Sequence, residues 1–176
     1  MSGNSGFMID EKTIARRVAE LGAQITKDYQ GKEPILIGIL KGAFVFLADL
    51  MRKIDLPVKV DFLAVSSYGK STESSGVVMI LKDIVEDIEG RDVIIVEDIL
   101  DTGLTLKNIV EHLQAKRPAS IKICVLLDKK ERRKVKIEAD YVGFDIPDKF
   151  IVGYGLDYAE KFRNLPYIRE IRQEEL

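Results

Sequence analysis

The chain has 176 residues, of which 46% are apolar and 32% charged, and its formal net charge at neutral pH is −2. This length is typical of one domain that buries roughly 70% of the surface its unfolded chain exposes. The near-neutral charge excludes a general electrostatic attraction to nucleic acid or to a membrane surface. A single cysteine, Cys124, excludes an internal disulfide framework, and one histidine, His112, leaves too few ligands for a zinc site or a catalytic triad.

The chain shows no segment that would direct it into or across a membrane. Its longest apolar region, residues 35–50, is interrupted by Lys41 and Asp49, whereas a membrane helix needs about 18 apolar residues. The first residues carry no signal-peptide pattern, and residues 1–6 are a small polar tail. Together with a lone cysteine in an apolar run, where core packing is expected, these features predict a reduced, cytoplasmic location.

The amino-terminal third predicts a helix, a strand and a second helix. Apolar residues recur at helical spacing before Gly31, which ends the first helix, at positions 14, 18, 21 and 25. Residues 35–40, ILIGIL, form a short apolar strand, and a second helix follows through apolar positions 44, 47, 50 and 51. A strand that leads directly into a helix is the repeating unit of parallel α/β sheets.

A hairpin with a long connection is expected next. Apolar residues alternate with polar ones over 58–64, and residues 77–81 form a further apolar run. The joining stretch 66–76, SSYGKSTESSG, consists mainly of hydroxyl residues and glycine. Most such loops are only connections, although a long surface loop is also a common place for functional residues.

Residues 93–106, VIIVEDILDTGLTL, carry most of the functional information. The β-branched run suits a strand buried on both faces, and a helical pattern follows it at positions 106, 109, 110 and 113. With another strand at 121–127, the repeated strand-turn-helix units predict an α/β fold with a doubly wound, mainly parallel sheet. Past Leu127 the charged, turn-rich composition predicts a smaller lobe rather than more parallel sheet.

The turn at residues 102–105 lies where this strand gives way to the helix. Ligands of open α/β sheets bind at such points, because free backbone N–H groups and the positive end of the helix dipole point out of the crevice. Gly103 permits close approach of an anion, while Thr102 and Thr105 add hydroxyl donors. The turn is therefore a candidate phosphate cradle.

Three carboxylates crowd beside this cradle, namely Glu97, Asp98 and Asp101. Because carboxylates only accept hydrogen bonds or hold cations, they call for a diol, a Mg²⁺ ion or a proton to abstract. A metal-bound sugar phosphate satisfies all three requirements. The loop lacks the lysine of the P-loop, which argues against a nucleoside triphosphatase. The plainer alternative is that two acids end a strand and Asp101 caps a helix.

The segment resembles the ribose-phosphate-binding motif of the type I phosphoribosyltransferases, which use phosphoribosyl pyrophosphate. The resemblance implies that Glu97 and Asp98 hold the ribose hydroxyls and Mg²⁺. It also implies that the turn surrounds the 5-phosphate and that Asp101 is the general base for the purine N7 proton. The variant of the motif with glutamate before aspartate resembles that of the 6-oxopurine branch of the family, whose substrates are hypoxanthine and guanine. Leu104 departs from relatives that have lysine there, which implies weaker or altered binding of phosphoribosyl pyrophosphate.

Other matches to the family extend from Leu40 to Arg163. Lys41 and Gly42 follow a strand and open a helix, so they form a second anion site by the same logic. The resemblance assigns this site to pyrophosphate and implies a cis Leu40–Lys41 bond. It also implies that Ser67 and Tyr68 belong to a mobile lid on the long hairpin loop.

The resemblance places purine recognition in the last third of the chain. It implies that Phe150 stacks on the base, that the Ile151 backbone and Asp157 contact its 2-position edge, with Asp157 also near Mg²⁺, and that Arg163 binds pyrophosphate. The resemblance further implies that Lys129, after the 121–127 strand, reads the 6-oxo group. Because an ammonium only donates, it favours an oxo group over the amino group of adenine.

Taken together, these features predict a single domain over residues 1–176. Its core covers about 35–128, and a hood is formed by the amino-terminal segment and about 129–176. The predicted activity is Mg²⁺-dependent phosphoribosyl transfer to hypoxanthine or guanine, and the family implies a homodimer or homotetramer.

Two alternatives remain open: an RNA-binding regulator of the same fold, contacting RNA through the basic run 129–136, and a transferase for xanthine or a pyrimidine. A solvated face is the commoner origin of such a run, and no aromatic residues interleave in it for base stacking. The predicted partners are therefore small molecules, with neither nucleic acid nor membrane among them. His112 is expected to be exposed and inert.

Overall fold

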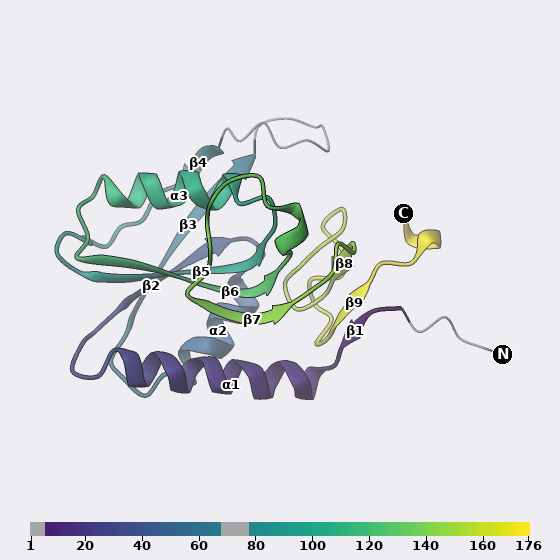
Figure 1. Cartoon of the computed structure of the whole chain (residues 1–176), viewed down its shortest axis with the longest axis horizontal. Helices are drawn as coiled ribbons and strands as arrows, with labels where there is room; N and C mark the ends of the chain where they lie inside the picture. The colour runs from purple at the N-terminus through teal and green to yellow at the C-terminus, as the bar shows by residue number, and fades with distance from the viewer. Residues whose placement is uncertain (1–5, 68–77) are drawn as a thin grey trace.

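A computed structural model describes residues 6–67 and 78–176, with Ser67 described by its backbone only (Figure 1). The main sheet has six strands in the order β4-β3-β2-β5-β6-β7. All neighbouring pairs are parallel except β3 and the edge strand β4. The bounds are β2 Ile35–Leu40, β3 Lys59–Ser67, β4 Val78–Lys82, β5 Asp92–Leu100, β6 Ser120–Asp128 and β7 Tyr141–Asp145.

Helices cover both faces of this sheet, which confirms the doubly wound prediction. Helices α1 (Glu11–Asp28) and α2 (Phe44–Met51) pack on one face with Leu36 and Ile94, and α3 (Leu104–Gln114) packs on the other with Ile35 and Ile95. Neighbouring strand residues point to opposite faces, so a continuously apolar strand is needed to fill both cores. Cys124 is fully buried in the first core, as expected.

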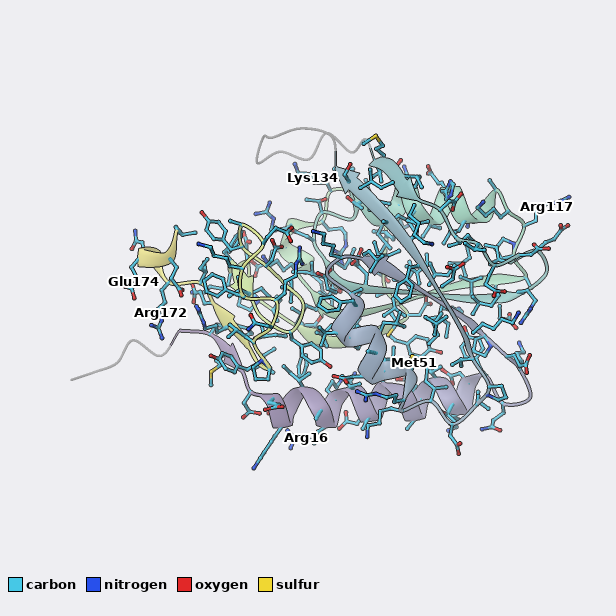
Figure 2. The ribbon with its side chains drawn as sticks, turned by 180° about the vertical axis from the view of Figure 1, so that it is seen from behind. Arg16, Met51, Arg117, Lys134, Arg172 and Glu174 are labelled. Carbon is cyan, nitrogen blue, oxygen red and sulfur yellow. The ribbon has the colours of Figure 1, made fainter. Side chains whose placement is uncertain are left out.

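The helix ends follow local sequence signals. The Asp10 carboxylate accepts a hydrogen bond from the Thr13 N–H at 2.7 Å and caps α1. The chain leaves this helix through Gly31, whose φ of +76° lies in the region that glycine adopts without strain. Outside the core, charged side chains such as Arg16, Arg117 and Glu174 extend away from the ribbon (Figure 2).

A small antiparallel sheet forms the hood at one end of the main sheet (Figure 1). Its strands are β1 (Met8–Ile9), β9 (Ile168–Glu170) and β8 (Ile151–Val152), in that order. The amino-terminal strand therefore pairs with the carboxyl-terminal one. Two short 3₁₀ helices, η1 (Lys130–Arg132) and η2 (Gln173–Glu175), complete the described elements.

Three expectations need correction. Strand β7 pairs in parallel with β6, so the main sheet continues past residue 128 and the boundary expected there is wrong for this strand. Strand β5 runs to Leu100, so it extends past the β-branched run from which it was predicted and includes both acids. His112 is not free: its imidazole lies 2.9 Å from an oxygen of Asp83, and hydrogen bonds from that imidazole and neighbouring groups outweigh burial and lower the Asp83 pKa to about 2.

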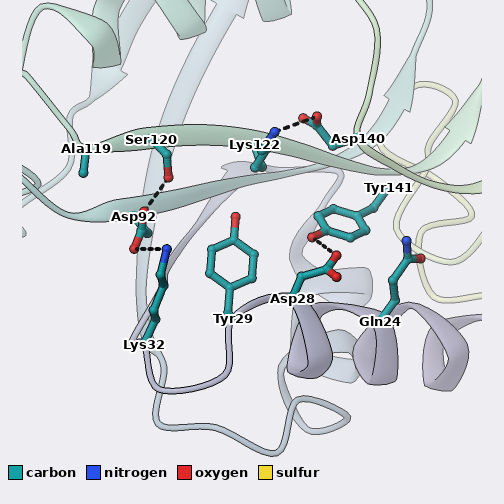
Figure 3. A pocket seen from close by; sticks show the side chains of 10 residues that line it. All are labelled: Gln24, Asp28, Tyr29, Lys32, Asp92, Ala119, Ser120, Lys122, Asp140 and Tyr141. Atoms are coloured by element: carbon teal, nitrogen blue, oxygen red, sulfur yellow. Dashed lines mark hydrogen bonds and ion pairs between the residues drawn. The ribbon is translucent and has the colours of Figure 1, made fainter.

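A hollow of about 670 Å³ lies where α1 ends, at the amino ends of β5 and β6 (Figure 3). Its carboxylates are held by neighbours in the hollow: Asp92 by Ser120 at 2.6 Å, Asp28 by the Tyr141 hydroxyl at 2.7 Å, and Asp140 by Lys122 at 3.5 Å. This hollow is thus at the opposite end of the strands from the residues that the sequence singled out. Among the described residues, none of the helices combines the length and apolarity required to cross a lipid bilayer.

Candidate active site

The predicted site residues come together at the carboxyl ends of three adjacent parallel strands, beneath the hood. Lys41 follows β2, the acid pair lies in the last part of β5, and Lys129 follows β6. These strands neighbour one another in the sheet, so their ends form one edge. The Leu40–Lys41 peptide bond is cis, as the family resemblance implied.

Glu97 and Asp98 form a closely spaced carboxylate pair. One Glu97 oxygen accepts a hydrogen bond from the Asp98 N–H at 3.0 Å, and one Asp98 oxygen accepts from the Ile99 N–H at 2.7 Å. Burial, followed by the negative charge of Asp98, raises the pKa of Glu97 well above its ordinary value. Two such carboxylates favour a cation or a hydroxyl-bearing ligand beside them.

Two glycines let three backbone segments meet around this pair. A Cβ on Gly42 would overlap the Asp98 carboxylate, and a Cβ on Gly155 would overlap the Gly42 carbonyl oxygen. Gly155 also has a φ of +99°, a conformation that few other residues adopt. The hood is therefore in direct contact with the turn that follows β2.

The turn at 102–105 has the geometry of an anion site. Gly103 precedes α3 with a φ of +85°, and the first amide that bonds back along the helix is that of Lys107, to the Gly103 carbonyl at 2.9 Å. The amides before it have no helical acceptor, and the helix dipole adds positive potential there. The Leu104 N–H donates to the Thr102 hydroxyl oxygen at 3.4 Å.

Asp101 stands at the start of this turn, next to a cation that sequence reasoning missed. The Arg132 Nε lies 2.8 Å from the Asp101 Oδ1, but without the alignment that a hydrogen bond needs. The same guanidinium lies 3.6 Å from Asp148, which in turn lies 3.9 Å from the Lys129 Nζ. Lys129 is buried, with only 9% of its side chain exposed. The predicted base and the predicted purine-reading lysine are thus joined through one arginine and one aspartate.

The predicted purine-binding residues line the hood side of the site. Phe150 is 52% exposed and so lies outside the core, and its ring meets Tyr158 edge-on at 5.5 Å between centroids. The Phe150 carbonyl accepts a hydrogen bond from the Ile171 N–H at 2.9 Å. Along an antiparallel pair of strands, residue pairs that exchange backbone hydrogen bonds alternate with pairs that do not. Ile151 therefore faces Glu170 in a non-bonded pair, and its N–H and C=O are directed away from β9.

Arg163 and Lys41 share a carboxylate that the sequence had not singled out. Glu160 lies 3.1 Å from Lys41 and 3.2 Å from Arg163, and Arg163 also lies 3.3 Å from Asp157. The Arg163 guanidinium donates to the Gly155 carbonyl at 2.7 Å, while its Nε is buried without a hydrogen-bond partner. An anion between these two cations would take the place of Glu160 and would be well matched in charge.

The loop that carries these groups is conformationally strained. Four residues other than glycine adopt positive φ there, namely Tyr154, Ala159, Glu160 and Phe162. Such residues cost free energy and persist where the surrounding structure holds them, often at functional sites. No periodic pattern marks this strain, so sequence reasoning could not have placed Glu160.

The basic run at 129–136 is mostly engaged within the chain. Lys130 lies 3.0 Å from Asp145, and Arg133 lies 2.6 Å from the buried Asp128. With the contacts of Lys129 and Arg132, four of its six cations face carboxylates of the same chain. This finding weakens the alternative of an RNA contact through this run.

The donor set fits a Mg²⁺ ion that takes few protein ligands. In the part of the chain that the structure describes, no three acidic, histidine or cysteine side chains gather into a metal cluster. Glu97 and Asp98 offer a carboxylate pair, and Asp157 belongs to the separate group around Arg163. Mg²⁺ characteristically binds one or two carboxylates and completes its shell with phosphate oxygens and water. Strand β3 runs to Ser67, and the rest of the predicted lid, from Tyr68 to residue 76, lies outside the described residues.

Comparison with known proteins identifies the family. A phosphoribosyl transferase domain model matches residues 8–159. The hypoxanthine-guanine phosphoribosyltransferase of Bacillus subtilis is 55% identical over 161 residues, covering 92% of this chain and 89% of that protein. Its counterpart from Aquifex aeolicus is 56% identical over 163 residues, covering 92% of each.

The structural comparison agrees. The crystal structure of a hypoxanthine phosphoribosyltransferase from Staphylococcus aureus matches with a TM-score of 0.93 at 52% identity, covering 98% of this chain and 93% of that one. The likeness thus spans the main sheet, the hood and the strand ends where the site residues meet. The chain belongs to the phosphoribosyltransferase family, in its hypoxanthine-guanine branch.

Proposed function

We propose that this chain transfers 5-phosphoribose from phosphoribosyl pyrophosphate to N9 of hypoxanthine or guanine, with Mg²⁺, in purine salvage. The products are pyrophosphate and the nucleotide monophosphate. One observation carries the proposal: a phosphate turn, a carboxylate pair, two cations that share Glu160 and an exposed aromatic ring surround the same edge of the sheet. Each part of the substrate has a chemically matched partner there.

The ribose lies against the β5 acids in this proposal. Breaking the glycosyl bond builds positive charge on the ribose ring, so the carboxylates of Glu97 and Asp98 stabilise it while they hold its hydroxyls. The turn at 102–105 holds the 5-phosphate through backbone amides. Leu104 supplies no charge there, so we expect the affinity for phosphoribosyl pyrophosphate to be lower than with lysine at this position.

The leaving pyrophosphate lies between the β2 turn and the hood. Lys41, the Gly42 amide and Arg163 bind it, and Arg163 exchanges Glu160 for a phosphate oxygen. When bound, Mg²⁺ neutralises negative charge on the leaving group. Glu97, Asp98 and Asp157 are the residues that would hold it.

The purine lies between Phe150 and the end of β6. Phe150 stacks on the base, the Ile151 backbone groups contact its 2-position edge, and Lys129 donates to its 6-oxo group. Asp101 accepts the N7 proton as general base, which requires that the Arg132 guanidinium shift from its carboxylate. Adenine presents an amino group to a donor-only lysine and is rejected.

Organisation and assembly are part of the same proposal. Residues 1–176 form one domain whose hood completes the site, because Gly155 packs against the Gly42 carbonyl after β2 and Glu160 lies 3.1 Å from Lys41. We expect a homodimer or homotetramer in the cytoplasm. Apolar surface for the contact between subunits is offered by three exposed side chains, Met79 and Leu81 on the edge strand β4 and Phe44 on α2. Light scattering after size-exclusion chromatography measures the subunit number.

One assay tests the activity directly. The protein is mixed with Mg²⁺, phosphoribosyl pyrophosphate and hypoxanthine, guanine, xanthine, adenine or uracil, and pyrophosphate release is followed. Release with hypoxanthine or guanine supports the proposal, and no release with either base rejects it. Release with xanthine or uracil alone would indicate a different base, and RNA binding that weakens steeply with salt would indicate the regulator instead.

A further inference from the structure

The Arg133 side chain makes four hydrogen bonds near the site, yet the proposed reaction gives it no role. Its Nη1 donates to the Asp101 carbonyl at 2.7 Å and reaches the Leu100 carbonyl at 3.4 Å. Its Nη2 donates to Asp128 at 2.6 Å, and its Nε donates to the Ile137 carbonyl at 3.0 Å. Only 16% of the side chain is exposed. One guanidinium therefore joins the ends of β5 and β6 to the segment after η1.

The backbone around Arg133 holds the same turn. The Lys129 N–H donates to the Leu100 carbonyl at 2.9 Å, and the Lys134 N–H donates to the Thr102 carbonyl at 2.8 Å. With the bond from Arg133 to Asp101, three successive carbonyls, those of residues 100, 101 and 102, face the segment 129–134. Arg133 is the only one of these donors that is a side chain.

The direction of these carbonyls determines the direction of the amides that follow them. In a trans peptide the C=O and the next N–H lie in one plane and point to opposite sides. Carbonyls held by the segment 129–134 therefore turn the N–H groups of Asp101, Thr102 and Gly103 to the side of the turn away from that segment. Those amides, with the start of α3, are the donors of the phosphate turn.

The underside of the turn is closely packed, which limits any other arrangement. A Cβ on Gly103 would meet the Ile137 side chain at 2.5 Å, that of Val135 at 3.1 Å and the Arg133 Cδ at 3.2 Å. The guanidinium also has a fixed anionic partner, since the Asp128 side chain is only 3% exposed. A buried ion pair of this kind holds its geometry because either charge alone would be costly.

We infer that Arg133 is a positioning residue that sets the direction of the amides in the turn at 101–103 and thereby builds the 5-phosphate site. The inference rests on the proposed function, because it assigns the turn to that phosphate. Arg133 touches no substrate and acts through the backbone. Lysine cannot replace it, because an ammonium cannot span the acceptors on β5, β6 and Ile137 as the fork of a guanidinium does.

The test compares two ligands that occupy different parts of the site. Guanosine monophosphate carries the 5-phosphate, whereas Mg²⁺-pyrophosphate is held by Lys41 and Arg163. For Arg133→Lys, titration calorimetry is expected to show the dissociation constant of guanosine monophosphate rising roughly tenfold or more, with that of pyrophosphate changed less than twofold. A general loosening of the protein would weaken both.

Arg17→Lys is the matched control. Arg17 also donates to two backbone carbonyls, those of Val142 at 2.7 Å and Gly143 at 2.8 Å, and so joins α1 to β7. Its loss should lower the melting temperature without changing either dissociation constant. If Arg133→Lys fails to fold, the pair Arg133→Met with Asp128→Leu removes both buried charges together and carries the same expectation.

The outcomes separate this inference from the proposed function. If the unaltered protein binds no guanosine monophosphate, the proposed function itself fails. If it binds the nucleotide, and Arg133→Lys weakens both ligands equally or neither, the positioning role of Arg133 is overturned. A selective loss of nucleotide affinity in Arg133→Lys, with none in Arg17→Lys, supports it.

Discussion

Gly42 lies so close to Asp98 that no side chain fits between the turn after β2 and the carboxylate on β5. The contact joins two strands at their carboxyl ends, and the Gly155 backbone covers it from the hood. The second Asp98 oxygen is already held by the Ile99 N–H at 2.7 Å. The position of this carboxylate is thus set on both sides.

Gly42→Ala is expected to displace the Asp98 carboxylate while the fold survives, because only the end of one side chain must move. A misplacement of about 1 Å costs on the order of 10²-fold in rate, so we expect kcat/KM for phosphoribosyl pyrophosphate to fall by that factor. Gly90→Ala is the control: its φ of +68° costs stability, but nothing lies within 4 Å of its Cβ. Unchanged kinetics in Gly42→Ala would contradict the role of this contact.

Glu97→Gln is expected to stabilise the unliganded protein at neutral pH. Burial raises the folded-state pKa of Glu97, so ionisation costs stability as the pH rises from about 4.5 through that pKa. Glutamine avoids this cost. At pH values above this range, the melting temperature of the variant should therefore exceed that of the unaltered protein, by about 2–4 °C for each kcal/mol of stability regained. The difference should vanish toward pH 4.5, and the gain in melting temperature from Mg²⁺ with phosphoribosyl pyrophosphate should shrink in the variant.

Asp101→Asn tests the general base. The change is nearly isosteric and its neighbour Arg132 is 41% exposed, so we expect little effect on the melting temperature. An amide cannot take the N7 proton, and turnover with hypoxanthine should fall by roughly 10²–10⁴-fold. Full turnover in this variant, measured by pyrophosphate release, would remove Asp101 from that role.

Glu160→Gln is expected to strengthen pyrophosphate binding modestly. The carboxylate lies 3.1 Å from Lys41 and 3.2 Å from Arg163, so it competes with an anion for both cations. Because the Glu160 and Lys41 side chains are largely exposed, solvent weakens this competition, and the dissociation constant should fall only about twofold to fivefold. Glu174→Gln, on the outer surface of the carboxyl-terminal segment, serves as control. Weaker binding in Glu160→Gln would show that Glu160 supports the site instead.

Local sequence patterns were enough to predict the strand-turn-helix units and most of the chemical groups of the site. Strands 35–40 and 93–96 are apolar on both faces, so they could only be central strands of a covered sheet, and the turn at 102–105 followed from its glycine and hydroxyls. These features are local, because they depend on residues that are neighbours along the chain. The resemblance to the family motif added the predicted roles of the acids and of Lys129.

Which distant groups face one another depends instead on how the chain packs in three dimensions. Three contacts join segments that are many residues apart. They are Arg132 beside Asp101, Glu160 between Lys41 and Arg163, and Arg133 beneath the phosphate turn. Strand β7 was likewise missed, since its five residues have no strong alternation and are sheet only because β6 offers an edge to pair with. Such contacts depend on how the sheet and hood pack, and no periodicity along the chain encodes them.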